Sequence, residues 1–313
     1  MKKPIIILTG PTAVGKTQAS IELAKKIGGE IISADSMQVY QQMNIGTAKI
    51  TSEEMQGIPH YLVDVLPPDA PFHVYEFQQL AKQSLKQIYD NGHIPIVVGG
   101  TGFYIQALLY DIQFQEEKGS HGYREKLEEI AQNGGGDLLY HKLESVDPES
   151  AKAIHKNNIK RIIRALEYYE ETGNPISMHN EEQRQKDSPY CFLYAVLTMN
   201  RSQLYHRINK RVDLMMEQGL EEEVAELQKR GYGKELTSMQ AIGYKEWFPF
   251  FEGKCSREEV VEQIKKDTRH FAKRQLTWFR REREVHFIDK DAFLSEADIV
   301  NEIIGLAKEQ GVL

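Results

Sequence analysis

The residues with the clearest chemical meaning are Gly10–Thr17, which read GPTAVGKT. They fit the phosphate-loop pattern G-x-x-x-x-G-K-[ST] at every position. An apolar run, Ile5–Leu8, precedes them and a helix-like segment follows, which is the context that such a loop requires. An ordinary glycine-rich turn is the alternative, and the preceding strand disfavours it. The spacing therefore predicts a site that binds a phosphate or a diphosphate.

The side chains of this loop have distinct expected roles. Backbone N–H groups and the N-terminus of the following helix favour a bound anion. Lys16 is expected to reach the terminal phosphates, and the Thr17 hydroxyl to hold Mg²⁺ as the metal cofactor. The candidate diphosphate-binding residues are Gly10, Pro11, Thr12, Ala13, Val14, Gly15, Lys16 and Thr17.

Two further polar residues follow apolar strands. Asp35 comes after the second run, and Thr101 lies in the turn Gly99–Gly102 after the fourth. Ligands of open α/β sheets bind beyond the carboxyl ends of the strands, so both side chains are expected near the diphosphate. Asp35 can serve as a general base, a Mg²⁺ ligand or a helix N-cap. Thr101 can bond a leaving oxygen or cap the following helix.

Arginines and a basic segment form a second group of candidates. Arg161 and Arg164, and likewise Arg207 and Arg211, share helix faces, where they can neutralise a leaving phosphate or pair with glutamates. The chain carries a net charge of −7, yet Arg269–Arg283 combines six basic residues with interleaved aromatic ones. That composition indicates contact with nucleic acid, although an amphipathic surface helix would also explain it.

Six apolar runs between helix-like stretches predict the fold. The runs are Pro4–Leu8, Glu30–Ser33, Tyr61–Val65, Ile94–Val98, Phe192–Leu197 and Val285–Ile288. Most are continuous, which indicates strands buried on both faces of a parallel sheet. Helices are expected over Thr17–Lys26, Tyr75–Asn91, Phe103–Leu109, Arg124–Ala131, Lys156–Thr172, Arg201–Arg230 and Glu258–Arg283. The fold class is therefore α/β, a P-loop NTPase-like parallel sheet core with a helical insertion domain.

The expected insertion is the stretch in which strands are missing. No convincing strand occurs between about Asp111 and Ser188, and the alternation of strands and helices resumes at Tyr190. We predict a core of residues 1–112 and 189–313 and a lid-like insertion of residues 113–188.

Composition excludes several other classes of protein. The hydrophobic fraction of 41% and the charged fraction of 27% are ordinary, and no apolar run reaches the length of a membrane span. Two cysteines make neither a disulfide framework nor a zinc finger. A secretory signal would disrupt the phosphate loop, so a cytoplasmic location is expected.

Taken together, these residues resemble the tRNA dimethylallyltransferases, also called tRNA isopentenyltransferases, of the bacterial type. Single motifs are weak, but their joint order along nearly the whole chain is specific. The matching segments are Gly10–Thr17, Ile31–Tyr40, Ile45–Lys49, Gly57–His60, Val98–Tyr104, Arg161–Glu167, Met239–Glu246 and Ala272–Arg280.

The resemblance implies a reaction and roles for the candidate residues. A dimethylallyl group would move from dimethylallyl diphosphate to the exocyclic amine of the adenosine just 3′ of a tRNA anticodon. The family assigns the base to the aspartate that matches Asp35, and the contact with the bridging diphosphate oxygen to the threonine that matches Thr101. Arg161 and Arg211 match arginines implicated in catalysis or binding, and Lys16 would stabilise the departing diphosphate.

The resemblance also implies that the protein binds the anticodon loop of a tRNA. We expect the protein to be a monomer. The acceptor base must leave its stack to be modified, while basic residues hold the RNA backbone. The implied tRNA-binding residues are Asp35, Ser36, Met37, Gln38, Thr101, Arg124, Lys160, Arg161, Arg164, Lys273, Arg274 and Arg280.

Three other functions are compatible with parts of the sequence. An adenylate isopentenyltransferase would share the phosphate loop and Asp35 but would need neither the insertion nor Ala272–Arg280. A P-loop small-molecule kinase would transfer phosphate from ATP, and an RNA-binding protein with a relic nucleotide fold would catalyse nothing. An ATPase is disfavoured because the run Ile94–Val98 ends in glycines rather than in a Mg²⁺-binding carboxylate.

Overall fold

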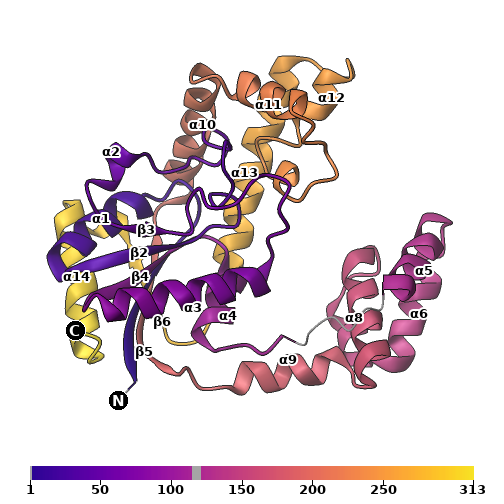
Figure 1. Ribbon diagram of the computed structural model, residues 1–313, viewed down its shortest axis with the longest axis horizontal. Helices are drawn as coiled ribbons and strands as arrows, with labels where there is room; N and C mark the ends of the chain where they lie inside the picture. The colour runs from indigo at the N-terminus through magenta and orange to yellow at the C-terminus, as the bar shows by residue number, and fades with distance from the viewer. Residues whose placement is uncertain (1, 115–120) are drawn as a thin grey trace. The chain divides into compact units, whose positions relative to one another are not determined.

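The computed structural model describes residues 2–114 and 121–313, and they divide into two compact units (Figure 1). The first unit comprises Met1–Leu109 and Pro189–Leu313, and the second comprises Tyr110–Ser188. Among the described residues, no helix combines the length and the apolar character needed to cross a membrane.

A six-stranded parallel sheet forms the centre of the first unit, in the order β3-β2-β4-β1-β5-β6. The strands are β1 Lys3–Thr9, β2 Gly29–Ala34, β3 His60–Tyr61, β4 Ile94–Gly99, β5 Tyr190–Thr198 and β6 Val285–Asp289. Gly99 is in register with both Thr9 and Ala34. The residues that follow β1, β2 and β4 therefore meet at the carboxyl edge of the sheet, and the predicted α/β fold class is confirmed.

Helices cover the sheet on both faces, as Figure 1 shows for the first unit. The helices of this unit are α1 Lys16–Ile27, α2 Ser52–Met55, α3 Val74–Asp90, α4 Gly102–Leu109, α10 Arg201–Glu217, α11 Leu220–Lys229, α12 Trp247–Phe251, α13 Arg257–Phe279 and α14 Glu296–Glu309. Short 3₁₀ turns occupy Ser238–Gln240 and Lys290–Ala292.

One continuous core joins the sheet to α1 and α14. Leu8 and Leu193 from the strands pack in the same buried cluster as Leu23 of α1 and Ile303 of α14. Burial of each such aliphatic side chain stabilises the fold by about 1.5–3 kcal/mol. This core fixes the strand β1 and the helix α1, and thus both ends of the loop that joins them.

Two elements differ from the sequence prediction, one by ending earlier and one by being divided. The run Tyr61–Val65 forms a strand only as far as Tyr61, because Leu62 and Asp64 have φ values of 63° and 62°, outside the extended region. The single helix predicted over Arg201–Arg230 is two helices, α10 and α11, because Gly219 with φ of 93° breaks it.

The second unit is helical, and no strand occurs in the part of it that the structure describes. Its helices are α5 His121–Gln132, α6 Gly136–Val146, α7 Pro148–Ala153, α8 Ile159–Thr172 and α9 Ile176–Gln185. Leu127, Leu143 and Ile162 belong to its own buried core. The insertion predicted from sequence, residues 113–188, includes residues 115–120, which lie outside the described residues.

Buried Asp147 ties two helices of this unit together. Its carboxylate caps α7 by accepting a hydrogen bond from Ser150 N at 3.0 Å. It also accepts from Ser177 N at 3.0 Å and from Ser177 Oγ at 2.6 Å, at the start of α9. The cap therefore fixes the N-terminal ends of α7 and α9 against each other.

Candidate active site

The phosphate loop joins β1 to α1 at the carboxyl edge of the sheet. Gly15, the residue before α1, has φ of 100°, a conformation that glycine adopts at little cost. The Lys16 ammonium donates to the carbonyl oxygens of Gly10 and Pro11 at 3.0 and 2.9 Å. The loop thus curls around the lysine, and its cation lies where an anion would bind.

A cavity of about 320 Å³ opens beside this loop. It is lined by Thr12, Ala13, Gly15, Lys16 and Thr17 of the loop, by residues in or after other strands, and by residues of α1, α2, α10 and α13. The polar side chains among these include Asp35, Gln38, Glu54, Arg211 and Gln275, and Glu54 interacts electrostatically with Arg211. The structure therefore brings five of the eight predicted loop residues together with Asp35, Gln38 and Arg211.

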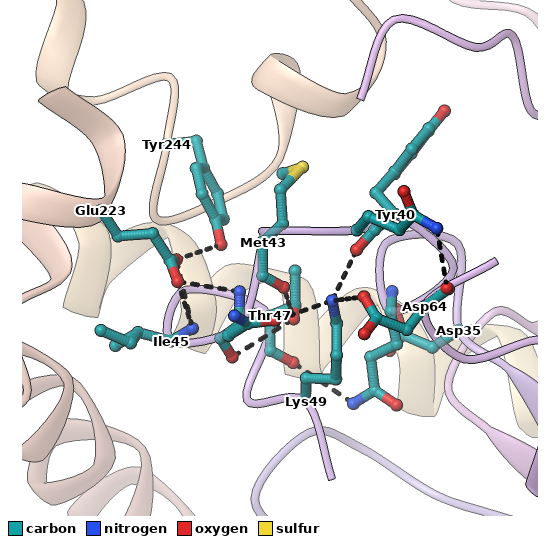
Figure 2. A network of polar contacts seen from close by, with 12 residues as sticks. Asp35, Tyr40, Met43, Ile45, Thr47, Lys49, Asp64, Glu223 and Tyr244 are labelled. Carbon is teal, nitrogen blue, oxygen red and sulfur yellow. Dashed lines mark hydrogen bonds and ion pairs between the residues drawn. The ribbon is translucent and has the colours of Figure 1, made fainter. Parts of the chain in front are cut away.

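Asp35 follows β2 and closes a tight turn. Its Oδ1 accepts hydrogen bonds from Met37 N at 2.8 Å and Gln38 N at 3.3 Å. The helix N-cap that the sequence left open is therefore not formed, because no helix directly follows Asp35 and its carboxylate holds a turn instead. The carboxylate also lines the cavity and interacts electrostatically with Lys16 and Arg211, so holding the turn leaves its chemistry available. Figure 2 shows Asp35 beside the neighbouring polar network.

Burial changes the acid–base behaviour of the cations. Burial, followed by the positive charge of Arg211, lowers the pKa of Lys16 to about 7, although Asp35 opposes the shift. Burial and the nearby Arg207 likewise lower the pKa of Arg211. Crowded, desolvated cations of this kind gain most from an anion of high charge, which is what a diphosphate provides.

The side-chain amide of Gln38 has a defined orientation. Its Nε2 donates to the carbonyl oxygens of Thr47 at 3.3 Å and Ala48 at 3.1 Å. Because both partners are acceptors, the NH₂ group must face them, which leaves Oε1 as the acceptor that Gln38 can present. Gln38 lines the cavity, so it can accept a hydrogen bond from an amine bound there.

The turn after β4 is fastened to the phosphate loop by a residue that sequence reasoning missed. Gln275 of α13, only 6% exposed, accepts from Thr12 N at 2.9 Å and donates to Gly100 O at 3.0 Å. A glutamine on the buried face of an amphipathic helix was the signal that could have revealed it. Thr101 is half-buried next to this turn, and its backbone carbonyl starts α4, but it is not among the cavity-lining residues.

Replacing Gln275 by leucine tests this connection. We expect Q275L to leave Thr12 N and Gly100 O without partners, at a cost of about 1–3 kcal/mol for each buried group. Calorimetry should show a lower Tm, and pyrophosphate should bind more weakly because the loop is no longer fixed. The matched control is Q263L at an exposed position of the same helix. Equal Tm and equal affinity in Q275L and Q263L would contradict the assigned role.

The basic residues predicted to contact RNA lie on two surfaces. Lys273, Arg274 and Arg280 are exposed on or just beyond α13, while Ala272, Gln275 and Phe279 are buried, so the segment forms an amphipathic helix and its contact with nucleic acid stays a prediction. In the helical unit, Lys160 and Arg161 are exposed on α8. Arg164 bonds Glu167 at 3.2 Å, which is the glutamate pairing that the sequence left open for this arginine, and Arg124 bonds the same glutamate at 3.4 Å.

The oxygen atoms that line the cavity suit a Mg²⁺ ion whose other ligands come mainly from a bound substrate. Thr17 and Asp35 both line it, and Mg²⁺ commonly takes one or two protein oxygens together with phosphate oxygens and water. Within the described ranges, no group of three or more histidine, cysteine, aspartate or glutamate side chains could hold a metal ion. A site completed by phosphate oxygens therefore suits these residues better than an all-protein cage.

A parallel sheet with a phosphate loop after its first strand and a carboxylate after its second defines a phosphate-loop α/β protein. Comparison with known proteins narrows this class. The profile of the IPP transferase family matches residues 38–282. The chain belongs to this family and is a transferase, which confirms the resemblance seen in the sequence.

The relatives align with nearly the whole chain. A tRNA dimethylallyltransferase of Lachnoclostridium phytofermentans is 55% identical over 311 residues, which covers 99% of each chain. A tRNA isopentenylpyrophosphate transferase from Staphylococcus epidermidis is 47% identical in sequence. Its crystal structure matches with a TM-score of 0.73, and the alignment covers 99% of this chain and 100% of that one. A eukaryotic dimethylallyltransferase acting on tRNA is 30% identical in sequence, and its crystal structure matches with a TM-score of 0.81. This alignment covers 97% of this chain and 80% of the eukaryotic one.

Proposed function

We propose that this transferase moves a dimethylallyl group from dimethylallyl diphosphate to the exocyclic amine of the adenosine that follows a tRNA anticodon. The carbon–oxygen bond to the diphosphate breaks, a carbon–nitrogen bond forms, and a proton leaves the amine. The observation that carries the proposal is the cavity in which a phosphate loop and Asp35 face the same space. The names of the relatives support the same substrates.

The cations of the cavity act on the leaving group. As the carbon–oxygen bond breaks, negative charge grows on the diphosphate, and the partly buried cations Lys16 and Arg211 offset it. Loop N–H groups at the start of α1 contribute in the same direction. Thr101 is proposed to bond the bridging oxygen, and Mg²⁺ bound through Thr17 would neutralise further charge on the diphosphate.

Asp35 and Gln38 act on the acceptor. An aromatic amine is a poor nucleophile, and a carboxylate that takes its proton during attack accelerates the reaction by about 10²–10⁴-fold. Gln38 Oε1 is proposed to accept a hydrogen bond from the same amine, which orients it. Proton transfer to Asp35 and release of pyrophosphate together balance the reaction.

The titration of Lys16 predicts how donor affinity changes with pH. Below pH 7 the free protein already carries the ammonium that binds the diphosphate, so its contribution is fully present. Above pH 7 the proton must be taken up on binding, and affinity should fall by up to about tenfold per pH unit. Calorimetry with pyrophosphate in buffers of different ionisation enthalpy should detect proton uptake at pH 8. A K16M variant, which corrects for ionisation of the ligand, should lack this uptake, and equal uptake in both proteins would be incompatible with the assignment.

RNA binding is proposed for the exposed basic residues, in a cytoplasmic protein that acts as a monomer. Lys160, Arg161 and Arg164 of the helical unit and Lys273 and Arg274 of α13 would contact phosphates. Contacts of this kind release counterions, which makes affinity depend steeply on salt.

The salt dependence supplies a direct test of the α13 surface. Removing two phosphate contacts in K273A/R274A should reduce the slope of log affinity against log salt by about 1.4–1.8. The measurement is a titration of an anticodon stem-loop at several NaCl concentrations. K308A, at an exposed position of α14, should leave the slope unchanged. A double variant with the slope of the wild type would remove this surface from the RNA-binding account.

One assay separates the proposed function from its alternatives. The protein is incubated with Mg²⁺, labelled dimethylallyl diphosphate and either unmodified tRNA or AMP. Label in tRNA is the expected result. Label in AMP would indicate an adenylate isopentenyltransferase, whereas phosphate transfer from ATP would indicate a kinase. RNA binding without any turnover would indicate a non-catalytic protein.

A further inference from the structure

The turn Asn44–Ala48 is held by a carboxylate from a distant part of the chain. Glu223 of α11 accepts hydrogen bonds from three consecutive backbone N–H groups, those of Asn44 at 2.8 Å, Ile45 at 2.8 Å and Gly46 at 3.1 Å. Successive N–H groups that converge in this way form an anion-binding nest. Figure 2 shows Glu223 pointing into this turn.

A second residue completes the contact. The Tyr244 hydroxyl, in a side chain that is fully buried, donates to Glu223 Oε1 at 2.6 Å. A Cβ atom at Gly46 would overlap the Tyr244 ring, so only glycine allows the turn to approach the ring this closely. The carboxylate, the phenol and the turn therefore form one packed unit.

The opposite side of the same turn is fixed by a lysine. Lys49, whose side chain is 6% exposed, donates to Tyr40 O at 2.6 Å, Asn44 Oδ1 at 2.9 Å and Asp64 Oδ1 at 2.7 Å (Figure 2). Movement of the turn is therefore resisted from two directions. Its position depends most on Glu223, because that side chain alone bonds three of its N–H groups.

This turn supplies the two carbonyls that orient Gln38. Thr47 O and Ala48 O accept from Gln38 Nε2 and so turn Oε1 into the acceptor available to the cavity. If the turn shifted, the amide could rotate and present its NH₂ group instead. An NH₂ group cannot accept a hydrogen bond from the exocyclic amine of an adenine, so recognition of the base would be lost.

We propose that Glu223 is a positioning residue for the acceptor base: it holds the turn Asn44–Ala48, and the turn holds Gln38 as a hydrogen-bond acceptor. The inference rests on the proposed function, because it assumes that an adenosine amine enters the cavity. Glu223 is not among the residues that line the cavity, and it bonds the turn that orients Gln38, so the effect of its loss should fall on the acceptor and not on the donor.

The decisive variant is E223Q, which keeps the size of the side chain but turns an NH₂ group toward backbone N–H groups. With a tRNA anticodon stem-loop as substrate, kcat should fall by about 10–100-fold, since small misplacements of reacting groups have effects of this size. The affinity for pyrophosphate should stay within a factor of about two of the wild type, as should all values for E222Q, an exposed neighbour on α11.

A binding ratio separates positioning from a loss of stability. Two stem-loops are compared that carry adenosine or purine riboside, which lacks the exocyclic amine, at the target position. Wild-type protein should bind the adenosine form more tightly, and E223Q should bind both equally. Phosphate contacts are shared by the two stem-loops and cancel in the ratio. The proposal would be overturned if E223Q had the same preference for the adenosine stem-loop and the same kcat as the wild type.

Transfer by wild-type protein and transfer by E223Q test different statements. If wild-type protein transfers no label to tRNA, the proposed function is wrong. If wild type is active and E223Q is equally active and selective, only the role of Glu223 is wrong. Should E223Q not fold, Y244F carries the test, because it removes a single hydrogen bond of the same carboxylate. A smaller loss of kcat in the same direction is expected, and no loss would again overturn the proposal.

Discussion

Replacing Asp35 by alanine is expected to lower kcat for tRNA modification by about 10²–10⁴-fold, the contribution of a general base. The affinity for the anticodon stem-loop should change little, because phosphate contacts elsewhere supply most of it. Single-turnover kinetics with saturating donor measures the chemical step directly. A rate equal to that of the wild type would remove Asp35 from the mechanism.

Asparagine at the same position separates the two roles of Asp35. The amide oxygen introduced by D35N can still accept from Met37 N and Gln38 N, so this variant should keep the turn and the Tm of the wild type. It should nevertheless be as inactive as D35A, because an amide takes no proton. Recovery of activity in D35N would mean that the residue only holds the turn. If the activity of D35N recovered only at high Mg²⁺ concentration, Asp35 would instead be identified as a ligand of the metal ion.

Replacing Lys16 by methionine should cause the second large loss. We expect kcat/KM for dimethylallyl diphosphate to fall by about 10²–10³-fold, as when one donor to a developing anion is removed. Both donor affinity and kcat should decline, because Lys16 interacts with the diphosphate before and during bond breaking. Steady-state kinetics with varied donor at saturating tRNA measures the two effects.

The control for this variant is K26M, at an exposed position of the same helix. K26M should retain wild-type kinetics, which shows that one lost charge on α1 has no general effect. K16M should also bind the stem-loop like the wild type. If K16M retained full kcat/KM, the phosphate loop could not be the site of the leaving group.

The sequence predicts the centre of the site because parallel strands end at one edge. The spacing of Gly10–Thr17 specifies the loop, and the apolar run before Asp35 specifies its strand. Once both strands lie in a parallel sheet, Asp35 and the loop are expected at the same edge, and the observed strand order, with only β4 between β1 and β2, brings them close. The family resemblance adds substrates, and the relatives agree with it.

The supports of the site could not be predicted in the same way. Glu223 lies 179 residues from Asn44, and its contact depends on how α11 packs, which no local pattern encodes. Gln275 similarly joins Thr12 and Gly100 across long stretches of chain. The break at Gly219 was also missed, because the apolar periodicity continues through it and only its left-handed backbone ends the helix.

The phosphate loop is proposed to bind the diphosphate of a prenyl donor while Asp35 faces the amine of an extruded adenosine. A crystal structure with an unreactive dimethylallyl diphosphate analogue and an anticodon stem-loop tests it most directly. We predict the diphosphate against Lys16 and the loop amides, and the adenine amine within hydrogen-bonding distance of the Asp35 carboxylate. A diphosphate bound elsewhere, or an adenine still stacked in the RNA and remote from Asp35, would contradict the account.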